Sequence, residues 1–414
     1  MRKQSTEHPV SSSLTWENLE AHLRLRAQGW LQDLFVAELD EFLGRTKSQR
    51  RRPLDAAAGY RNGYGKPRRL TLMGGTVTLR RPRARGLEAR FESRILPLFA
   101  RRTPGVDALL PELYLHGLAQ GDFDLALRGL LGEDAPLSPA TIGRLKEKWR
   151  SEWEAWLSRD LSGLEVVYLW VDGVYVKAGL EKEKAALLVV LAALSDGRKE
   201  FLSVVPGHRE STEAWAEVLR DLKRRGLEAP RLVVGDGHLG IWGALRGVWP
   251  EAMEQRCWNH KIVNVLDKVP KRRQGQARLL LRQIPYAPSL REAERLKGSF
   301  ERWCQKHGLE EAAKVLERDW DQMLAFYRFP KEHWGHLRTT NPLESPFAAL
   351  RLRTDAAKRF KRVDSATALV WKMLMVAERR FRRLNAPELL KEVYEGVKFT
   401  DGMRDDANAR EAAA

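Results

Sequence analysis

Residues 165–256 contain several short apolar runs and one amphipathic segment, and the order of these segments is compatible with few folds. Three consecutive runs have the length, apolar character and flanking glycine or charge of strands: EVVYLWVDGVYVKAG, KAALLVVLAALSDG and KEFLSVVPGHRE. An amphipathic helix is predicted over 211–227, with Ser211 or Thr212 as its N-cap. A buried-type strand then ends at Asp236, and EAMEQRCW is compatible with one more. This order predicts an α/β fold with a mixed sheet covered by helices.

The rest of the chain is predicted to be helical, apart from one segment rich in Gly and Pro. Apolar residues recur every three or four positions in four stretches: 14–44, 106–161, 261–328 and 346–383. The segment 45–103 predicts strands or irregular structure. We divide the chain into 1–105 (helix and basic segment), 106–162 (helical), 163–260 (sheet core), 261–335 (all-helical insertion), 336–395 (C-terminal helices of the core) and 396–414 (disordered tail).

Charge is unevenly spread along the 414 residues, whose net charge is +17. Residues 45–103 hold 17 Lys or Arg against Asp55, Glu88 and Glu92, so most of the excess lies in this one segment. A solvated basic face is the ordinary explanation of a charge run, but this density favours a polyanionic partner. Within 106–161, Ser138 and Pro139 suit the start of a second helix, which is compatible with a DNA-reading helix-turn-helix or with two packed helices.

Two observations indicate the cellular compartment in which the protein is expected. No apolar run approaches the roughly 18 residues that cross a bilayer, and the first residues lack the apolar core of a secretory signal. Two cysteines do not build a disulfide framework. We therefore expect a cytoplasmic protein, associated with the nucleoid if its partner is DNA.

Three acidic residues stand where acidic residues are costly or unusual. Asp172 interrupts a buried strand, where an unpaired carboxylate would cost several kcal/mol. Asp236 ends a strand between two glycines, which suits ligand approach and ordinary turn chemistry equally well. Glu344 lies at a helix start, either as the third residue after an Asn341 N-cap or just before a helix that begins at Pro346, and helix capping is the default role.

Carboxylates that converge from strand ends and a helix start form an oxygen-rich site. Such ligands suit Mg²⁺, for which Mn²⁺ can substitute. Two ions about 4 Å apart can activate a water or a 3′-hydroxyl and stabilise the leaving oxygen of a phosphodiester. This chemistry agrees with a polyanionic partner.

Both cysteines of the chain occur in the pattern Cys-x-x-His. Cys257 precedes His260, and Cys304 precedes His307. The four side chains would satisfy a tetrahedral zinc ion. The second pair, however, lies in a charged helical stretch where this spacing arises by chance, and we favour a chance occurrence over zinc.

Seven stretches in this order resemble the Mutator-type transposases of bacterial insertion sequences, over about residues 20–395. The stretches are YRNGYGKPRRLTLMGGTVTLRRPRARG, YLHGLAQGDFDLALRGLLG followed by LSPATIGRLKEKW, VDGVYVKAG, HRESTEAWAEVLRDLKRRGL, LVVGDGHLGIWGAL, PEAMEQRCWNHKIVNVLDKVPK and TTNPLES. The resemblance implies a ribonuclease-H-like core with an all-α insertion, in which Asp172, Asp236 and Glu344 are the catalytic metal ligands. It also implies that Cys257 and His260 lie close to the active site, as His238 does through its DGH pattern.

These expectations amount to a DNA transposase that cleaves and joins strands by two-metal phosphoryl transfer. Its partners would be double-stranded DNA, namely the terminal inverted repeats and the target, and a second copy of the chain at least. The basic residues expected to contact DNA are Arg50, Arg51, Arg52, Arg61, Arg68, Arg69, Arg80, Arg81, Arg83, Arg85, Arg351, Arg353, Lys358 and Arg359. The alternatives are a nuclease of the same fold without strand transfer and a transposase-derived DNA-binding protein that has lost catalysis.

Overall fold

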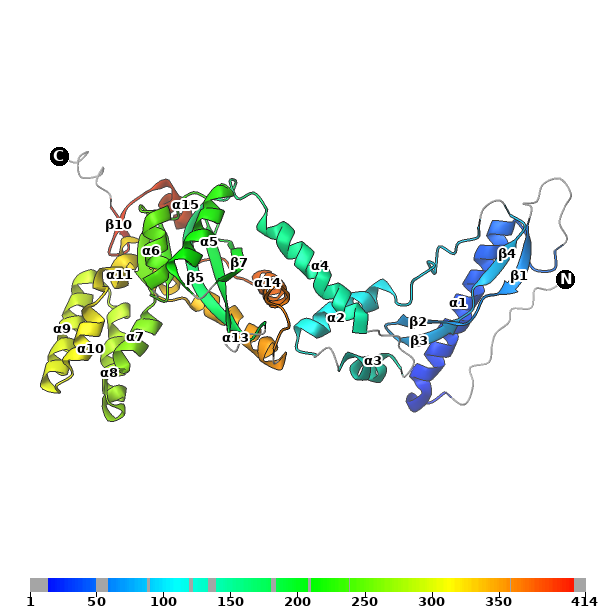
Figure 1. The fold of residues 1–414 in the computed structure, drawn as a ribbon, viewed down its shortest axis with the longest axis horizontal. Helices are drawn as coiled ribbons and strands as arrows, with labels where there is room; N and C mark the ends of the chain where they lie inside the picture. Colours follow the sequence, from blue (N-terminus) through cyan, green and yellow to red (C-terminus); the bar gives the residue numbers. More distant parts are fainter. Residues whose placement is uncertain are drawn as a thin grey trace. The chain divides into compact units, whose positions relative to one another are not determined.

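The computed structural model describes residues 14–49, 59–87, 90–118, 122–132, 139–179, 184–207, 210–237, 239–357 and 359–405. The chain divides into two compact units, Met1–Leu145 and Lys146–Ala414, and each is described by itself (Figure 1). Among the helices of the described ranges, none combines the length and apolar character that crossing a membrane requires.

The first unit begins with a long helix packed on short strands. Its elements are η1 (Trp16–Asn18), α1 (Leu19–Leu43), β1 (Tyr60–Tyr64), β2 (Arg68–Leu72), β3 (Gly75–Leu79) and β4 (Pro82–Arg85). β2 and β3 form an antiparallel pair within the segment 45–103, for which strands or irregular structure were predicted, and β1 pairs with β4. One small core joins Phe35 of α1, Leu70, Val77 and Leu79 of β2 and β3, and Leu96 from the chain after β4.

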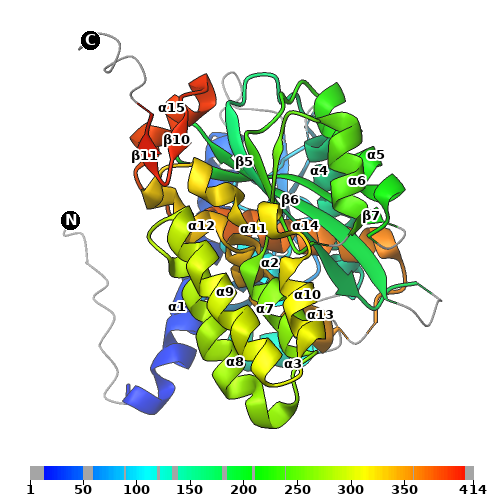
Figure 2. The ribbon, with the colours of Figure 1, turned by 90° about the vertical axis from the view of Figure 1, so that its left-hand side faces the viewer.

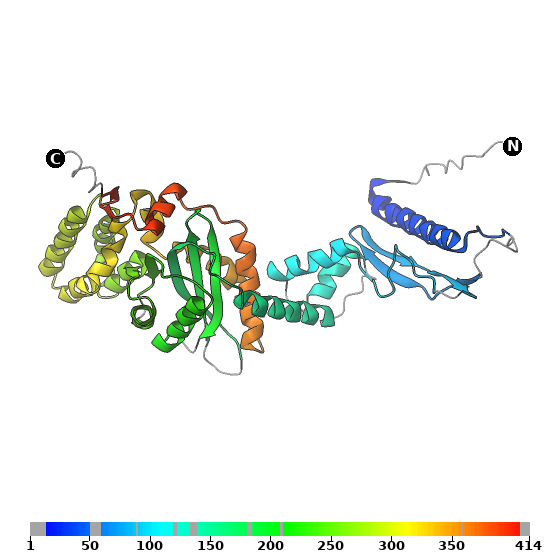
Figure 3. The ribbon, with the colours of Figure 1, turned by 90° about the horizontal axis from the view of Figure 1, so that it is seen from above.

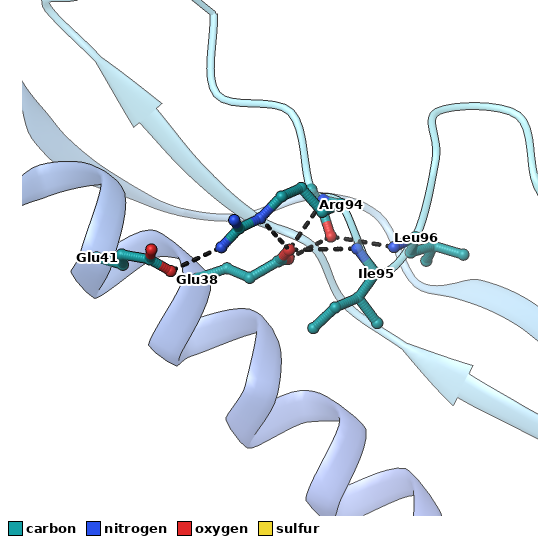
Figure 4. Close-up of polar contacts among 6 residues, drawn as sticks. Glu38, Glu41, Arg94, Ile95 and Leu96 are labelled. Carbon is teal, nitrogen blue, oxygen red and sulfur yellow. Dashed lines mark hydrogen bonds and ion pairs between the residues drawn. The ribbon is translucent and has the colours of Figure 1, made fainter.

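A buried carboxylate fastens α1 to the chain that follows β4 (Figure 4). Glu38 is only 9% exposed and accepts hydrogen bonds from the Ser93 hydroxyl, the Arg94 backbone N–H at 2.9 Å and the Ile95 N–H at 3.2 Å. The Arg94 side chain binds Glu41 on the next turn of the helix at 2.7 Å. Because its lone pairs are satisfied, this acidic residue stabilises the packing of the unit.

Three helices follow: α2 (Pro104–Leu115), α3 (Phe123–Leu131) and α4 (Pro139–Leu157). The helical prediction for 106–161 is therefore confirmed, and α4 begins at Pro139. Ser138, the expected N-cap, lies outside the described residues. The C-terminal half of α4 belongs to the second unit, where the Trp153 indole N–H donates to the Val204 carbonyl at 2.9 Å.

The second unit is built on a five-stranded mixed sheet with the order β7-β6-β5-β8-β9. Its strands are β5 (Val166–Val176), β6 (Ala185–Leu194), β7 (Lys199–Gly207), β8 (Leu232–Gly235) and β9 (Met253–Arg256). β5, β6 and β7 form an antiparallel meander, whereas β8 and β9 run parallel to β5. The predicted α/β class and mixed sheet are thus confirmed, and every predicted strand is present.

Helices cover both faces of this sheet. α5 (Thr212–Arg224) and α6 (Leu239–Val248) bury their apolar sides on one face, where Trp215, Leu219 and Trp249 are almost fully enclosed. α14 (Val363–Glu378), orange in Figure 3, lies against β7. Ser211 is the N-cap of α5 and accepts from the Ala214 N–H at 3.2 Å, as expected.

A helical segment separates β9 from the helix that carries Glu344. It contains α7 (Trp258–Leu266), α8 (Lys271–Gln283), η2 (Ile284–Tyr286), α9 (Leu290–Lys306), α10 (Glu310–Glu317), α11 (Trp320–Leu324), η3 (Ala325–Arg328), η4 (Lys331–His333) and α12 (Trp334–Leu337). Figure 2 shows α8, α9 and α10 side by side in this segment. The helical prediction for 261–328 is confirmed.

The chain ends with α13 (Asn341–Ala356), α14, α15 (Pro387–Glu395), β10 (Phe399–Thr400) and β11 (Met403–Arg404). We expected a disordered tail from residue 396, but β10 and β11 pair as a short antiparallel hairpin. The Lys331 N–H donates to the Gly402 carbonyl at 3.2 Å, and Phe399 is buried. These contacts explain why the hairpin is ordered. Residues 406–414 lie outside the described ranges.

Candidate active site

The pairing of β5 with β8 brings Asp172 next to Asp236. In this parallel pair Tyr168 lies opposite Leu232 and Trp170 opposite Val234, an offset of 64 residues. The same offset separates the two aspartates, which continue the register just beyond the last paired residues. Residues of equal register on neighbouring parallel strands lie side by side, so both carboxylates reach the same place, although β5 continues beyond Asp172 to Val176.

A third carboxylate joins this pair. Glu210 lies directly before the N-cap of α5, and its side chain is only 5% exposed. One ligand oxygen from each of Asp172, Glu210 and Asp236 lies within 4.8 Å of the other two. The described residues therefore contain a compact three-carboxylate group at the edge of the sheet.

The backbone at Gly173 makes room for this third carboxylate. A Cβ atom at residue 173 would collide with the Glu210 carboxylate, so no larger residue fits without moving it. The Tyr175 hydroxyl, two residues along the same strand, donates to Glu210 Oε1 at 2.8 Å. Burial and the neighbouring Glu210 raise the pKa of Tyr175, which keeps its proton available for this hydrogen bond.

Glu210 was missed in the sequence, where it reads as one more polar residue before a helix. The one local signal was Gly173. A glycine in the middle of a buried strand often marks the close approach of another group. The residue that approaches, however, is 37 positions away and is not identified by the glycine itself.

The close approach of the three carboxylates changes the pKa of Asp172. Burial and the negative charge of Asp236 raise its pKa from 3.8 to about 7, with Glu210 adding to the effect. The Gly173 N–H donates to its Oδ1 at 2.8 Å and opposes the shift. Clustered carboxylates that destabilise one another's charge are a fitting environment for a hard divalent cation, which would neutralise them.

Glu344 lies in a different group of donors. Its carboxylate, the Cys257 sulfur and a ring nitrogen of His260 lie within 4.8 Å of one another. Glu344 is in the first turn of α13, but Thr340 rather than Asn341 is the N-cap of this helix, and Pro346 lies inside it. The Thr340 hydroxyl donates to Glu344 Oε1 at 3.0 Å, so the side chain is held at the helix start without capping it.

Cys257 links this second group to the first. It follows β9 directly, is fully buried, and its backbone N–H donates to the Gly235 carbonyl at 2.7 Å, one residue before Asp236. His260 lies one turn into α7. A hydrogen bond with Cys257 raises the pKa of His260 to about 9, an effect that burial opposes and that Asp236 and Asp172 reinforce. These contacts bring Cys257 and His260 near the acidic residues, and their place beside an active site stays a prediction.

The second Cys-x-x-His pair has a different environment. Cys304 is fully buried in α9, where desolvation raises its pKa to about 11. His307 caps the end of that helix, and its ring lies 5.0 Å from the ring of Trp303. Among the described residues, neither belongs to any group of three metal-ligand side chains. A four-residue zinc site, already disfavoured by the sequence, has no support in this geometry.

The basic residues of the first unit divide by exposure. Arg69, Arg80, Arg83 and Arg85 are exposed, whereas Arg61, Arg68 and Arg81 are half-buried. Arg61 forms an ion pair with Asp40 and donates to the Arg45 carbonyl at 2.8 Å, and Arg68 donates to the Ala100 carbonyl at 3.0 Å. Arg61 and Arg68 therefore contribute to packing inside the unit.

The basic residues after Glu344 also differ from one another. Arg351 and Arg359 are exposed, and Arg359 donates to the Gly179 carbonyl at 2.9 Å. Arg353 is only 3% exposed, which does not suit a surface contact with phosphate. Four further predicted contacts lie outside the described residues, as does His238: Arg50, Arg51, Arg52 and Lys358.

Comparison with known proteins places this geometry in a family context. Residues 7–383 match the family model described as transposase, Mutator family. The transposase for insertion sequence element IS6120 of Mycolicibacterium smegmatis is 45% identical over 294 residues, which cover 71% of this chain and 91% of the relative. That for IST2 of Acidithiobacillus ferrooxidans is 42% identical, covering 67% and 94%. That for ISRM5 of Rhizobium meliloti (strain 1021) is 31% identical, covering 82% and 83%.

Proposed function

Because the chain belongs to the Mutator family of transposases, we propose that it cleaves and joins DNA strands at the ends of an insertion sequence, with Asp172, Asp236 and Glu344 as its catalytic carboxylates. The observation that carries the proposal is the in-register pair of aspartates at one edge of the sheet. Few structural roles explain two acidic side chains in such close contact, one inside the buried strand β5 and one directly after β8.

The donor set fits Mg²⁺. Asp172, Asp236 and Glu210 offer only carboxylate oxygens, the ligands that this cation prefers. When bound, Mg²⁺ would activate the attacking water or 3′-hydroxyl and stabilise the leaving oxygen of the phosphodiester. Asp172 and Asp236 would hold the ions, Glu344 would complete the set, and Gly173 would keep space for Glu210 beside them.

The strand order supports a ribonuclease-H-like core. Three antiparallel strands lead into two strands parallel to the first, in the order β7-β6-β5-β8-β9. The acidic pair stands on the central strand β5 and its parallel neighbour β8. A helical insertion then precedes the glutamate, as the family resemblance implies.

Substrate binding falls to the basic regions. We assign the terminal inverted repeats to the exposed arginines of the first unit and to the helices α2–α4. Arg351 and Arg359 would hold DNA phosphates near Glu344. Two element ends must be held together during joining, so the active assembly contains at least two copies of the chain.

The test is a strand-transfer assay. A duplex that carries the element's own terminal repeat and flanking DNA, labelled at the 5′ end of the strand whose 3′-hydroxyl is released, is incubated with the protein and a target plasmid in Mg²⁺, in Mn²⁺ and in EDTA. We expect joining of the label to the plasmid in either metal and none in EDTA. Cleavage without joining would instead identify a nuclease of the same fold.

Asp172→Ala is the matched variant. It removes one carboxylate and leaves the basic surfaces intact, so cleavage should fall by at least about 100-fold while binding of the repeat is retained. Full cleavage by this variant would overturn the site assignment. Binding of the repeat by the wild-type protein, without cleavage in either metal, would identify a DNA-binding protein that has lost catalysis.

A further inference from the structure

A second group of metal-ligand atoms lies beside the carboxylate site and differs from it in chemistry. It combines the Cys257 sulfur, a His260 ring nitrogen and a Glu344 oxygen, all within 4.8 Å of one another. We infer that these three side chains form a site for one soft divalent cation, Zn²⁺, and that Zn²⁺ at this site withholds Glu344 from the carboxylate group.

The three ligands are positioned by neighbouring backbone that is itself held in place. Cys257 is the N-cap of α7, so His260 follows it on the first turn of the same helix. Two hydrogen bonds connect that turn to residues 338–341, where the end of α12 leads into the start of α13. The Trp258 N–H donates to the Arg338 carbonyl at 2.9 Å, and the Asn259 amide donates to Asn341 Oδ1 at 3.0 Å.

The sulfur of Cys257 is held in position by Thr340. Cys257 is fully buried, its Sγ accepts from the Thr340 backbone N–H at 3.4 Å, and the Thr340 hydroxyl oxygen lies 3.4 Å from the same sulfur. Hydrogen bonds to a ligand atom from neighbouring residues fix its orientation toward a metal. The same hydroxyl lies 3.0 Å from Glu344 Oε1, so Thr340 contacts two of the three ligands.

The histidine also has capacity to bind. Its Nδ1 atom is buried and makes no hydrogen bond to any residue that the structure describes. A buried ring nitrogen without a partner is costly, and a metal ion bound at Nδ1 would supply that partner. This is an observation independent of the spacing of the three ligands.

The ligand types select the metal. Sulfur and imidazole nitrogen are poor ligands for Mg²⁺, whereas Zn²⁺ binds Cys, His and Glu at about 2.0–2.3 Å. Ligand atoms already within 4.8 Å of one another need only small side-chain adjustments to reach a tetrahedral arrangement. Three protein ligands leave the fourth position to water.

Because Glu344 belongs to both the proposed Zn²⁺ site and the proposed catalytic site, Zn²⁺ binding should affect catalytic activity. The proposed function requires this carboxylate beside Asp172 and Asp236, and a carboxylate bound to Zn²⁺ cannot serve there. This regulatory part depends on the proposed function, whereas the binding of Zn²⁺ does not.

Binding is tested first, without DNA, on the full chain. The reduced, metal-free protein is titrated with Zn²⁺ by calorimetry and with Co²⁺ by absorption, where a thiolate-to-cobalt charge-transfer band reports sulfur ligation. We expect one equivalent of either metal and the charge-transfer band. Cys257→Ser should lose the band and at least about tenfold in Zn²⁺ affinity.

Cys304→Ser is the control, because Cys304 is the other cysteine and is equally buried. It should keep both the band and the affinity. Wild-type affinity in Cys257→Ser, or loss of the band in Cys304→Ser instead, would overturn the site. If Cys257→Ser does not fold, judged by circular dichroism, His260→Gln replaces it, with the same tenfold loss expected and the same unchanged affinity overturning the site.

Inhibition is tested separately. One equivalent of Zn²⁺ should lower the Mg²⁺-dependent cleavage rate of the wild-type protein at least fivefold, relative to its own zinc-free rate. The ratio should approach one in Cys257→Ser. Equal inhibition of both proteins would overturn the regulatory part. Absence of cleavage in zinc-free wild-type protein contradicts the proposed function and leaves the binding result standing.

Discussion

Asp172 should lower the free energy of unfolding of the metal-free protein at neutral and alkaline pH. Its pKa is about 7 in the folded chain, compared with an ordinary value of 3.8, because burial and Asp236 disfavour its charge. The folded state therefore loses stability as pH rises from about 4 to 7, and the loss is complete above that range. Asp172→Asn should raise the melting temperature at pH 8 by about 2–4 °C for each kcal/mol relieved.

Comparing the melting temperatures of Asp172→Asn and the wild type at two pH values distinguishes an electrostatic effect from a change in side-chain packing. In calorimetric scans without metal, the gain from Asp172→Asn should be smaller at pH 5 than at pH 8. Mg²⁺ should raise the melting temperature of the wild type more at pH 8 than at pH 5, since the cation binds the ionised carboxylate. A gain that is independent of pH would contradict an electrostatic origin.

Gly173 supports a second prediction at the level of single residues. Gly173→Ala places a methyl group where the Glu210 carboxylate lies, so unfolding free energy should fall by roughly 1–3 kcal/mol. Gly247→Ala is the control, since a Cβ at that exposed position on α6 meets nothing within 4 Å. It should be neutral or stabilising. The unfolding free energies of both variants are measured by urea denaturation. Similar losses of unfolding free energy in the two would refute the inference that Gly173 leaves room for the Glu210 carboxylate.

The candidate residues show what sequence can and cannot supply. Asp172 was identified because a charge inside an apolar strand is costly, and this needs only local information. Glu210 was missed because its importance depends on the chain turning back over Gly173, which no local pattern records. Arg353 was expected to contact DNA because it follows Glu344 on a basic helix, but its place on the inner face of α13 buries it.

At the level of elements, the contact between α7 and the start of α13 should control the position of Glu344. Asn259→Ala removes the hydrogen bond to Asn341 and should lower the cleavage rate several-fold, by about 1 kcal/mol in activation free energy, without removing a ligand. Asn264→Ala changes an exposed residue of the same helix and should leave the rate unaltered. Equal rates in the two variants would show that this contact has no such role.

Elements were predictable where their signals were local. The strands β5–β8 and helix α5 follow from apolar period and N-cap chemistry, and their bounds agree with the structure within a few residues. Two starts were predicted for α13. The one with Asn341 as N-cap was one residue late, because Thr339, Thr340 and Asn341 are all good caps in sequence, and the one at Pro346 was wrong, since Pro346 lies inside the helix. The hairpin β10–β11 was missed because its stability comes from contact with residues about 70 positions earlier.

For the whole molecule, the concentration of charge in residues 45–103 predicts DNA binding that depends strongly on salt. Replacing Arg80, Arg83 and Arg85 with Ala should weaken binding of the terminal repeat and lower the salt slope by about 0.9 for each phosphate that is no longer neutralised. The measurement is fluorescence anisotropy across a salt series.

The control removes the same charge elsewhere. Arg198, Arg224 and Arg295 are exposed but paired with Asp196, Asp221 and Glu292, respectively. Their triple replacement with Ala should change the salt slope little, because these charges are already neutralised locally. An equal change in both triple variants would show that net charge, rather than the basic segment, governs binding.

The parallel register of β5 and β8 also determines how this chain can tolerate change in length. The two aspartates are aligned by hydrogen bonds between strands, so residues added in the turn between α5 and β8 leave their alignment unaltered. One residue deleted inside β8 before Asp236 would instead turn that carboxylate to the opposite face of the sheet. Related chains can therefore vary freely in the length of their connections, while the length of these short strands is fixed by the chemistry at their ends.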